Sequence, residues 1–275
     1  MRVNVYVVTY NNAERLNQNI NTFFQTTEHL KDHVFQYHVI NNHHNFHFSL
    51  RHHSNIAVFH NSMRPAASCG HLSRDYNMSI VHGFQNLNAP ACDQVICCHD
   101  DIWWHENWFE TLQEIHQTYD FYAGNYGCSL TSYLPSAVKR IGLWDERFVG
   151  LGYHEADMYL RALIYNKEKS SINDYFGGRV LNSTKVIFDH PPTNTNKQLH
   201  MDAAINFHTI SRRVFEAKWN VHPESWETRL TEVPTQPLIP SFMYYPWFEL
   251  DVETLDEQNY IWQPKGLEHF KAEWN

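Results

Sequence analysis

Short apolar runs alternate with longer amphipathic segments over residues 1–120 of the chain. β-branched and aromatic residues dominate these runs, which cover residues 3–10, 34–40, 55–61 and 93–98. Runs of this length without a helical period are typical of strands buried on both faces of a sheet. This part of the chain therefore predicts four buried strands.

The segments between these runs carry apolar residues at helical spacing. Leu16, Ile20 and Phe23 recur in this way after the first run. The same spacing predicts helices over residues 11–25, 70–84 and 106–119. Strands that alternate with helices predict an α/β fold, in which a mostly parallel, Rossmann-like sheet has helices on both faces.

The pattern becomes less regular after residue 120. Residues 122–135 are rich in turn formers and predict extended chain in a small second, mixed sheet, and residues 136–142 predict a short helix. A further strand is expected over residues 185–190 and a helix over residues 203–219. The last segment is rich in aromatic residues and prolines, which predicts either a ligand-binding surface or a homo-oligomer contact.

Composition and charge narrow the class of protein. The chain has 275 residues, of which 43% are hydrophobic, and a formal net charge of −9 with its histidines neutral. This composition indicates a globular protein and argues against a nucleic-acid partner held by a broad basic surface. Five cysteines, an odd number, favour a reducing compartment, and no apolar run is long enough to span a membrane. We therefore expect a cytoplasmic protein.

Polar residues follow three of the predicted strands. They are Thr9, Tyr10 and Asn11 after the first, Asn41 and Asn42 after the second, and His99, Asp100 and Asp101 after the fourth. Ligands of open α/β sheets bind at the carboxyl ends of the strands, so these side chains are expected to meet at one site. The chain has no Gly-x-Gly-x-x-Gly after the first strand and no phosphate-binding P-loop, which argues against a dinucleotide site.

The pair Asp100 and Asp101 has two interpretations. Adjacent carboxylates at the ligand-binding edge of a sheet are costly to bury unless a cation meets them. Mg²⁺ or Mn²⁺ that carries a diphosphate would satisfy them, because such cations take one or two carboxylates together with phosphate oxygens. Alternatively, Asp101 caps the helix that is expected to start near Glu106. The doublet alone favours neither interpretation.

A second acidic pair lies in "FVGLGYHEADMYLRA" at residues 148–162. If a helix starts near Glu155, Asp157 can pair with Arg161 at i,i+4, a structural use. Glu155 then lies at the start of the helix and faces a cleft, where a carboxylate can act as a general base. The alternative is that Glu155 only complements the helix dipole.

Several segments, taken in order, resemble inverting family 2-type glycosyltransferases with a GT-A fold. They are "VYVVTYNN" at 5–12, "VINN" at 39–42, "CGHLSRDYNMSI" at 69–80, "ICCHDDI" at 96–102 and "GLWDERFVGLGYHEADMYLRA" at 142–162. The last segment also resembles the Gly-x-Gly-x-x-Glu-x-Asp block of β-1,4-galactosyltransferases, and "IFDHPPT" at 187–193 resembles a strand that ends in a metal-binding histidine.

The resemblance implies metal-dependent transfer of a hexosyl group from a nucleotide-diphosphate sugar, most simply a UDP-sugar, to a hydroxyl of a glycan or other acceptor, with inversion. In the resemblance Glu155 takes the place of the catalytic base. Asp101 takes the second acidic place of the Asp-x-Asp metal motif and is also assigned as catalytic. Mn²⁺ or Mg²⁺ would be held by Asp101, His99 and His190. The residues implied for the donor nucleotide are Thr9, Tyr10, Asn11, Asn41, Arg74 and Asp100. Those implied for the sugar or acceptor are Trp103, Trp104, Trp144 and Asp157, with core packing as the alternative for Trp144.

Under this interpretation residues 1–190 form the nucleotide-sugar-binding and catalytic domain, and residues 191–275 form a helical and aromatic extension packed on it. His99 stands in place of an acidic residue of the family pattern, and Glu155 is longer than its usual aspartate, which motivates a second hypothesis. The chain would then be a catalytically inactive nucleotide-sugar or carbohydrate-binding module. A metal phosphohydrolase, suggested by the adjacent His99 and Asp100, and a nucleotidyltransferase are further alternatives.

Overall fold

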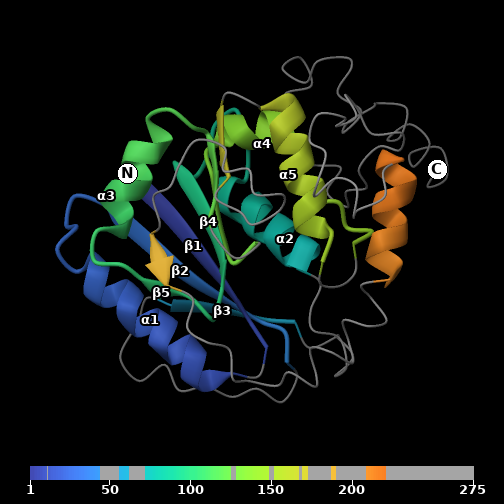
Figure 1. Cartoon of the computed structure of the whole chain (residues 1–275). Helices are drawn as coiled ribbons and strands as arrows, with labels where there is room; N and C mark the ends of the chain where they lie inside the picture. Colours follow the sequence, from blue (N-terminus) through green and yellow to red (C-terminus); the bar gives the residue numbers. More distant parts are fainter. Residues whose placement is uncertain are drawn as a thin grey trace, which may run out of the picture.

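A computed structural model describes residues 1–10, 12–43, 56–61, 72–124, 128–148, 152–166, 169–172, 187–189 and 209–220. These residues form three layers, with a twisted main sheet between two sets of helices (Figure 1). The α/β class with helices on both faces of the sheet is confirmed.

Seven strands of the described residues form the main sheet in the order β3-β2-β1-β4-β7-β6-β8. Their bounds are β1 Arg2–Thr9, β2 Val34–Asn41, β3 Ile56–His60, β4 Gln94–His99, β6 Phe121–Ala123, β7 Leu130–Tyr133 and β8 Ser170–Ile172. β1 pairs in parallel with β2 and β4, whereas β7 is antiparallel to both β4 and β6. The amino end of β7 therefore lies where β1, β2 and β4 end, and we call this side of the sheet the carboxyl edge.

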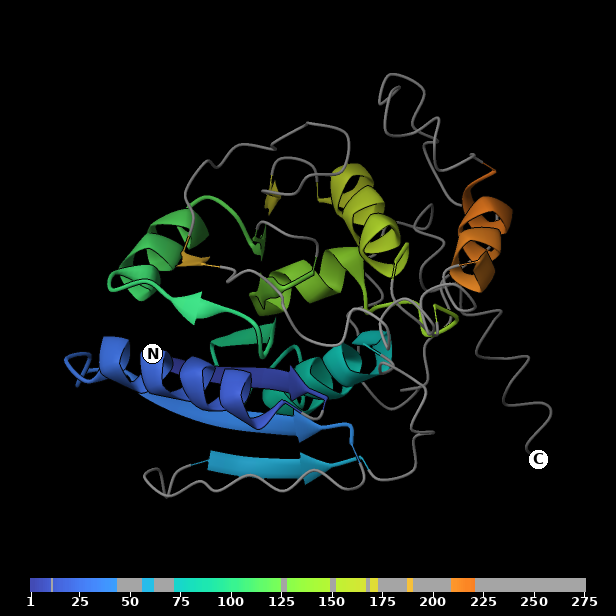
Figure 2. The ribbon, with the colours of Figure 1, turned by 60° about the horizontal axis from the view of Figure 1, so that its bottom comes forward.

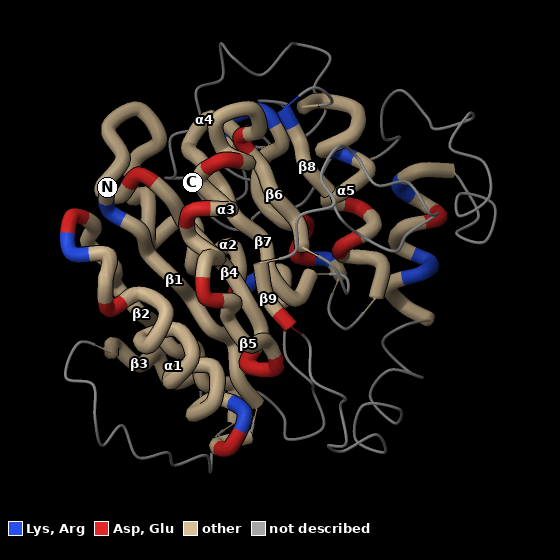
Figure 3. The backbone as a smooth tube through the Cα atoms, turned by 60° about the vertical axis from the view of Figure 1, so that its left-hand side comes forward, with Lys and Arg blue, Asp and Glu red and all other residues tan. Residues whose placement is uncertain are grey.

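The central strands are buried on both faces, as their continuous apolar sequences predict. In β1, Val3, Val5 and Val7 pack into one hydrophobic cluster. Tyr6 and Val8 alternate with them and pack into the cluster on the opposite face. Because side chains alternate along a strand, an apolar run of this kind can only be satisfied in the middle of a layered fold. Figure 3 accordingly shows charged positions mainly on helices and turns rather than on the central strands.

The helices divide between the two faces. The structure places α1 Ala13–Thr27, α2 Leu72–Phe84, α3 Trp108–His116, α4 Pro135–Ile141 and α5 His154–Tyr165 in chain order. Residues of α1 and α3 share a cluster with one face of the sheet, and residues of α2, α4 and α5 share the cluster on the other face. Figure 2 shows α1 and α2 on opposite sides of the blue strands.

A small second sheet is present, but it is built from other residues than expected. It pairs β5 Trp103–Trp104 in antiparallel orientation with β9 Phe188–Asp189. Assignment of residues 122–135 to the second sheet is wrong, because β6 and β7 extend the main sheet beside β4. The physical reason is that the side chains of Phe121, Tyr122 and Leu130 are fully buried between the two helical layers.

The described part of the C-terminal segment is a helix over residues 209–219. Phe215 and Trp219 of this helix pack with Phe148, Ala156 and Leu160 in a third hydrophobic cluster. The helix therefore docks on α5. The domain boundary at residue 190, the start of the helix expected from residue 203 and the aromatic segment after residue 220 lie outside the described residues, so these expectations stay predictions.

Within the described ranges, no helix combines the length and apolar character that a membrane crossing requires.

Candidate functional site

The polar strand ends meet at the carboxyl edge, as expected. In the parallel register Thr9 lies beside Asn41, and Val8 lies beside His99. The side chain of Asn41 is buried; its Nδ2 lies 3.1 Å from Nδ1 of His60, and its Oδ1 accepts a hydrogen bond from the backbone N–H of His43. These contacts fix the chain that leaves β2.

Asp100 points inward from the end of β4. The Thr9 hydroxyl donates a hydrogen bond of 2.5 Å to Oδ2 of Asp100. Burial, together with the neighbouring charge of Asp101, raises the pKa of Asp100 to about 7. Asp100 therefore joins the ends of β1 and β4, and its carboxyl group titrates near neutrality.

Asp101 lies between Arg15 and His99. Its Oδ2 lies 3.7 Å from Nη1 of Arg15 on α1, and its Oδ1 lies 3.8 Å from Nδ1 of His99. The capping role considered for Asp101 is wrong, because α3 starts at Trp108 and its N-cap residue is Asn107. With 15% of its side chain exposed, Asp101 can contact a ligand.

Cys128 lies at the amino end of β7, between two histidines. Its sulfur is 3.1 Å from Nε2 of His154 and 3.6 Å from Nε2 of His99. β7 is antiparallel to β4, so the residues before β7 reach the same edge as the residues that end β4. The antiparallel strand thus brings the thiol of Cys128 to the edge at which β1, β2 and β4 end.

The start of α5 supplies a further carboxylate, that of Glu155. Gly152 and the N-cap residue Tyr153 both have positive φ, 85° and 65°, so the chain turns sharply into the helix. Oε2 of Glu155 lies 2.8 Å from Nδ1 of the buried His154, and 13% of the Glu155 side chain remains exposed. After this sharp turn, His154 lies beside Cys128 at the carboxyl edge, and Glu155 lies beside His154.

These contacts form one continuous row of groups from α1 to α5. In order, the row is Arg15, Asp101, His99, Cys128, His154 and Glu155. Each neighbour in the row has the opposite charge when the histidines are protonated and the cysteine is a thiolate.

The pKa values follow this alternation. Burial alone would lower the pKa of both histidines, but their acidic neighbours raise the pKa of His99 to about 9 and that of His154 well above its usual range. Burial opposes ionisation of Cys128 and Glu155, yet His154 beside each of them lowers both pKa values. The contacts along the row thus favour the charged form of His99, Cys128, His154 and Glu155.

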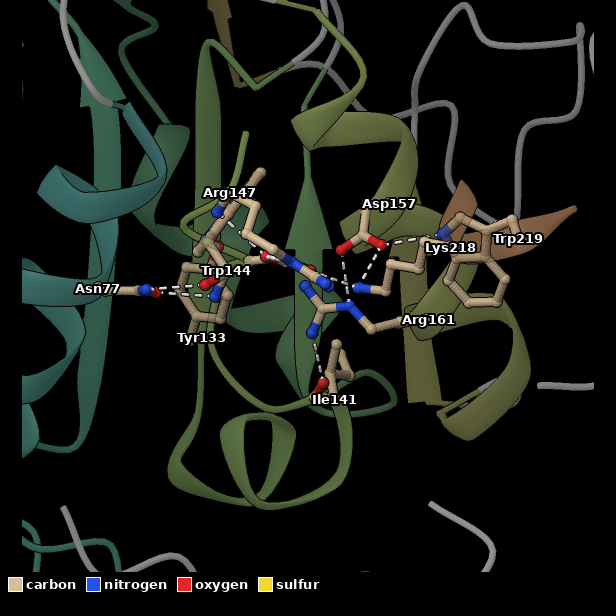
Figure 4. A network of polar contacts seen from close by, with 10 residues as sticks. Asn77, Tyr133, Ile141, Trp144, Arg147, Asp157, Arg161, Lys218 and Trp219 are labelled. Carbon is tan, nitrogen blue, oxygen red and sulfur yellow. Dashed lines mark hydrogen bonds and ion pairs between the residues drawn. The ribbon is translucent and has the colours of Figure 1, made fainter. Parts of the chain in front are cut away.

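Asp157 belongs to a different, structural network (Figure 4). The expected pair with Arg161 is confirmed, with Nε of Arg161 3.0 Å from Oδ2 of Asp157. Oδ1 of Asp157 lies 2.6 Å from Nζ of Lys218, and the indole of Trp219 donates to the same oxygen. Asp157 is fully buried, so its described contacts hold α5 to the helix over residues 209–219 and leave no surface for a sugar.

Two polar residues of α2 have distinct positions. Asn77 is buried; it donates from Nδ2 to the carbonyl of Trp144 and to Oε1 of Glu146, and accepts from the backbone N–H of Trp144. Arg74 is largely exposed and lies 3.5 Å from Oε2 of Glu146. Asn77 thus fixes the turn before α5, while Arg74 is open to a ligand.

The three implicated tryptophans differ in exposure. Trp144 is fully buried and donates from Nε1 to the Tyr133 hydroxyl, which favours its packing role. Trp104 is also buried and donates to Asn19. Trp103, 36% exposed, is the one of the three with open surface.

Sequence reasoning did not identify Cys128 or Lys218 as members of these networks. Cys128 lies in turn-rich chain with no recognisable ligand spacing, and Lys218 lies far along the chain from its carboxylate partners. Adjacency of His154 to Glu155 in the motif was a signal for His154. Asn11 and His190 lie outside the described residues, so their assigned roles stay predictions.

Comparisons with known proteins give structural likenesses only. No family model matches the chain, and no curated protein sequence does. Staphylococcus aureus TarS (residues 1–349) is similar with a TM-score of 0.46 and 14% identity over 68% of this chain and 60% of that chain. The catalytic domain of Drosophila β1,4-galactosyltransferase 7, in complex with xylobiose, is similar with a TM-score of 0.46 and 12% identity over 77% of this chain and 79% of that chain.

The Pyrobaculum calidifontis mannosyltransferase PcManGT, in complex with GDP-Man and Mn²⁺, gives a TM-score of 0.43 and 9% identity over 63% of this chain and 55% of that chain. This chain thus spans less than two thirds of the TarS and PcManGT chains. At these identities, and with TM-scores below 0.5, the likenesses do not establish the family of this chain.

Proposed function

We propose that the chain is a metal-dependent, inverting glycosyltransferase that moves a hexosyl group from a nucleotide-diphosphate sugar, most simply a UDP-sugar, to an acceptor hydroxyl. The observation that carries the proposal is the continuous row of contacts between Asp101, at the end of β4, and Glu155, at the start of α5. Two carboxylates from distant parts of the sequence thereby flank one edge of the sheet, in the order of motifs that resembles this class of enzyme.

The donor nucleotide is assigned to the ends of β1 and β2. Thr9 and Asn41 are neighbours there, and Tyr10 lies next to Thr9 with its ring 5.1 Å from that of His43. Asn11 completes this group in sequence, and Arg74, exposed on α2, supplies a positive charge for phosphate oxygens. Asp100 holds Thr9 in this position through the hydrogen bond that it accepts from the Thr9 hydroxyl.

A Mg²⁺ or Mn²⁺ ion with the diphosphate fits Asp101. Its carboxylate is partly exposed at the mouth of the site, and such ions need only one or two protein carboxylates when phosphate oxygens complete the shell. His99 offers a nitrogen 3.8 Å from Asp101, and His190 is assigned as a further ligand. When bound, the ion would offset the charge that develops on the departing diphosphate.

Glu155 is assigned the proton transfer. It would accept the proton of the acceptor hydroxyl, which then attacks the anomeric carbon from the face opposite the diphosphate and inverts it. The low pKa caused by His154 keeps Glu155 ionised at neutral pH. Trp103, which is exposed two residues after Asp101, offers a ring face on which a sugar of the acceptor can stack.

The contact between Glu155 and His154 also favours a second candidate. A carboxylate held 2.8 Å from a buried imidazole is a weaker proton acceptor than a free one. A nucleotide-sugar or carbohydrate-binding module without turnover would tolerate this arrangement. It predicts binding of the donor with no product.

The test is titration calorimetry and product analysis with UDP-, GDP- and dTDP-sugars, with and without Mn²⁺. A transferase is expected to bind one nucleotide in a Mn²⁺-dependent manner and to hydrolyse that donor slowly, with both properties weakened in Asp101→Asn. Asp32→Asn, at an exposed site beyond α1 and away from the carboxyl edge, is the matched control. Binding without any turnover supports the binding module, and absence of binding throughout the panel would overturn the proposal.

A further inference from the structure

The two-stranded sheet of β5 and β9 has one buried face and one exposed face. Trp104 and Phe188 are direct partners across the two strands, and both side chains are buried in the hydrophobic cluster that they share with α1 and α3. Trp103 and Asp189 also pair directly, and they point to the opposite face because side chains alternate along a strand. That face is open, with 36% of Trp103 and 70% of the Asp189 side chain exposed.

The buried face anchors both strands. The indole of Trp104 donates to Oδ1 of Asn19 on α1 at 3.0 Å, and its ring centre lies 4.5 Å from that of Trp108 on α3. Phe188 packs so closely on Gly124 that a Cβ atom at this glycine would clash with the phenyl ring. Because both strands are held from below, the outward direction of the opposite face is fixed before any ligand binds.

His105 adds an imidazole to the exposed face. It follows Trp103 by two residues, and its backbone N–H donates to the carbonyl of Ile187, which continues the pairing of the two strands. Its Nε2 lies 3.1 Å from Oδ1 of Asp189, and 37% of the His105 side chain is exposed. This contact orients the carboxylate on the same face as the exposed indole.

An exposed indole beside an oriented carboxylate can bind a sugar ring. Among the residues that the structure describes, three large hydrophobic side chains are exposed, and Trp103 is the aromatic one beside Val34 and Ile210. Its ring can cover the C–H face of a pyranose, while Asp189 accepts hydrogen bonds from hydroxyls at the edge of the same sugar. The Cβ atoms of directly opposite residues lie about 4.5–5.5 Å apart, so one monosaccharide can contact both side chains.

We propose that the exposed face of the β5–β9 sheet is a binding subsite for a neutral sugar ring, in which Trp103 stacks on the ring, Asp189 accepts hydrogen bonds from vicinal hydroxyls and His105 positions Asp189. The sugar is uncharged, because a carboxylate or phosphate on it would meet the like charge of Asp189. Trp103 follows Asp101 by two residues, which places the sugar near the end of β4. The role of this sugar as the acceptor of transfer rests on the proposed function, whereas the sugar site itself does not.

The test is saturation-transfer NMR of the full chain with neutral sugars, each with and without UDP and Mn²⁺. The probes are the methyl glycosides and β-linked disaccharides of glucose, galactose, N-acetylglucosamine and xylose, and the methyl glycosides of glucuronic and galacturonic acid are their charged counterparts. We expect at least one neutral sugar to bind through the protons of one ring face, and neither uronic acid to bind as tightly.

Affinity for that sugar is expected to fall about 10-fold in both Trp103→Ala and Asp189→Asn, and to be largely kept in Trp103→Phe, which retains a ring. Val34→Ala and Glu110→Gln are the matched controls and should bind as the wild type does. Val34, at the start of β2, is likewise exposed and apolar, and Glu110 forms the same kind of exposed pair with His29.

Three results would overturn the proposal. They are absence of sugar binding both with and without UDP and Mn²⁺, wild-type affinity in Trp103→Ala, and a uronic acid that binds as tightly as its neutral counterpart. If circular dichroism shows that Trp103→Ala is unfolded, Asp189→Asn at an exposed position replaces it, and wild-type affinity there equally excludes the subsite.

The subsite and the transferase can fail separately. Sugar binding that depends on Trp103, without hydrolysis of any donor, would support the subsite and contradict sugar transfer. Donor hydrolysis without sugar binding at this face would support the transferase and exclude the subsite.

Discussion

Nζ of Lys218 lies 2.6 Å from Oδ1 of Asp157, in a fully buried contact between the helix over residues 209–219 and α5. Nζ also lies 2.9 Å from Oδ2 of Asp145, so one ammonium joins two carboxylates. Asp145 is further paired with Arg147, and Asp157 with Arg161. The helix over residues 209–219 is thereby fixed to α5 by charge as well as by the packing of Trp219.

Replacing Lys218 by Met is expected to lower the free energy of unfolding by about 3–5 kcal/mol, because it leaves two buried carboxylates short of their shared partner. Urea unfolding of wild type and variant measures the change. Arg212→Ala is the control, since its i,i+4 pair with Glu216 is partly exposed and contributes about 0.5 kcal/mol or less. Equal effects of the two substitutions would show that the buried network does not hold the helix.

Replacing Asn77 by Ala is expected to destabilise the chain by about 1–3 kcal/mol, because the buried backbone N–H of Trp144 loses its acceptor and Glu146 loses one of its donors. It should also lower any sugar-transfer activity, because the turn that Asn77 holds leads into α5. Thermal unfolding and an activity assay check the two effects. Asn88→Ala, which removes only an exposed contact with Lys139, should change neither.

His38 is expected to make stability depend on pH. Its ring is buried against Tyr6, and neither ring nitrogen has a hydrogen-bond partner among the described residues. Burial, and to a smaller extent the charge of the nearby His82, lowers the pKa of His38 from 6.5 to about 4. Between these two pH values the unfolded chain binds a proton that the folded chain does not. The contribution of His38 is therefore complete above about pH 6.5 and is lost as the pH falls toward 4, by on the order of 2–3 kcal/mol.

His38→Phe removes this titration and keeps a ring against Tyr6. The stability advantage of the variant over the wild type is expected to grow between pH 7 and pH 5, as measured by urea unfolding at each pH. Part of the acid sensitivity should remain, because burial also lowers the pKa of His116 to about 4. A difference between the two chains that is independent of pH would contradict the assignment to His38.

Glu155→Gln is expected to lower the turnover number for sugar transfer by about 10²- to 10⁴-fold, with little change in donor affinity, because glutamine keeps the size of the side chain but cannot accept the proton. Steady-state kinetics and donor titration on the same preparation separate the two quantities. Glu28→Gln, at an exposed carboxylate just after α1, is the control and should match the wild type. An unchanged turnover in Glu155→Gln would remove the base from the mechanism.

Local sequence pattern determined the secondary structure of the central sheet. The apolar run that became β1 and the helical spacing of Leu16, Ile20 and Phe23 in α1 depend on near neighbours and on burial, which the pattern reports directly. The convergence of Thr9, Asn41 and His99 also followed, because parallel strands bring their carboxyl ends to one edge. Pairing of Asp157 with Arg161 followed from helical geometry alone.

The strand direction of β7 could not be derived in this way. Residues 122–135 predicted a separate sheet, because a turn-rich sequence does not show which strand it pairs with. In the structure β7 pairs with β4 in the buried main sheet. That antiparallel strand is what brings Cys128 between His99 and His154. A cysteine in a turn carries no signal of such neighbours.

The sequence by itself determined an α/β chain with strand-end acids and a helix-start carboxylate, since these features depend on periods of two and 3.6 residues that any short window contains. Only the tertiary structure decided which charges meet. The alternating row from Arg15 to Glu155 and the contact of Lys218 with Asp157 both join residues far apart in the chain. Their partners are chosen by the packing of whole elements, which no local pattern encodes.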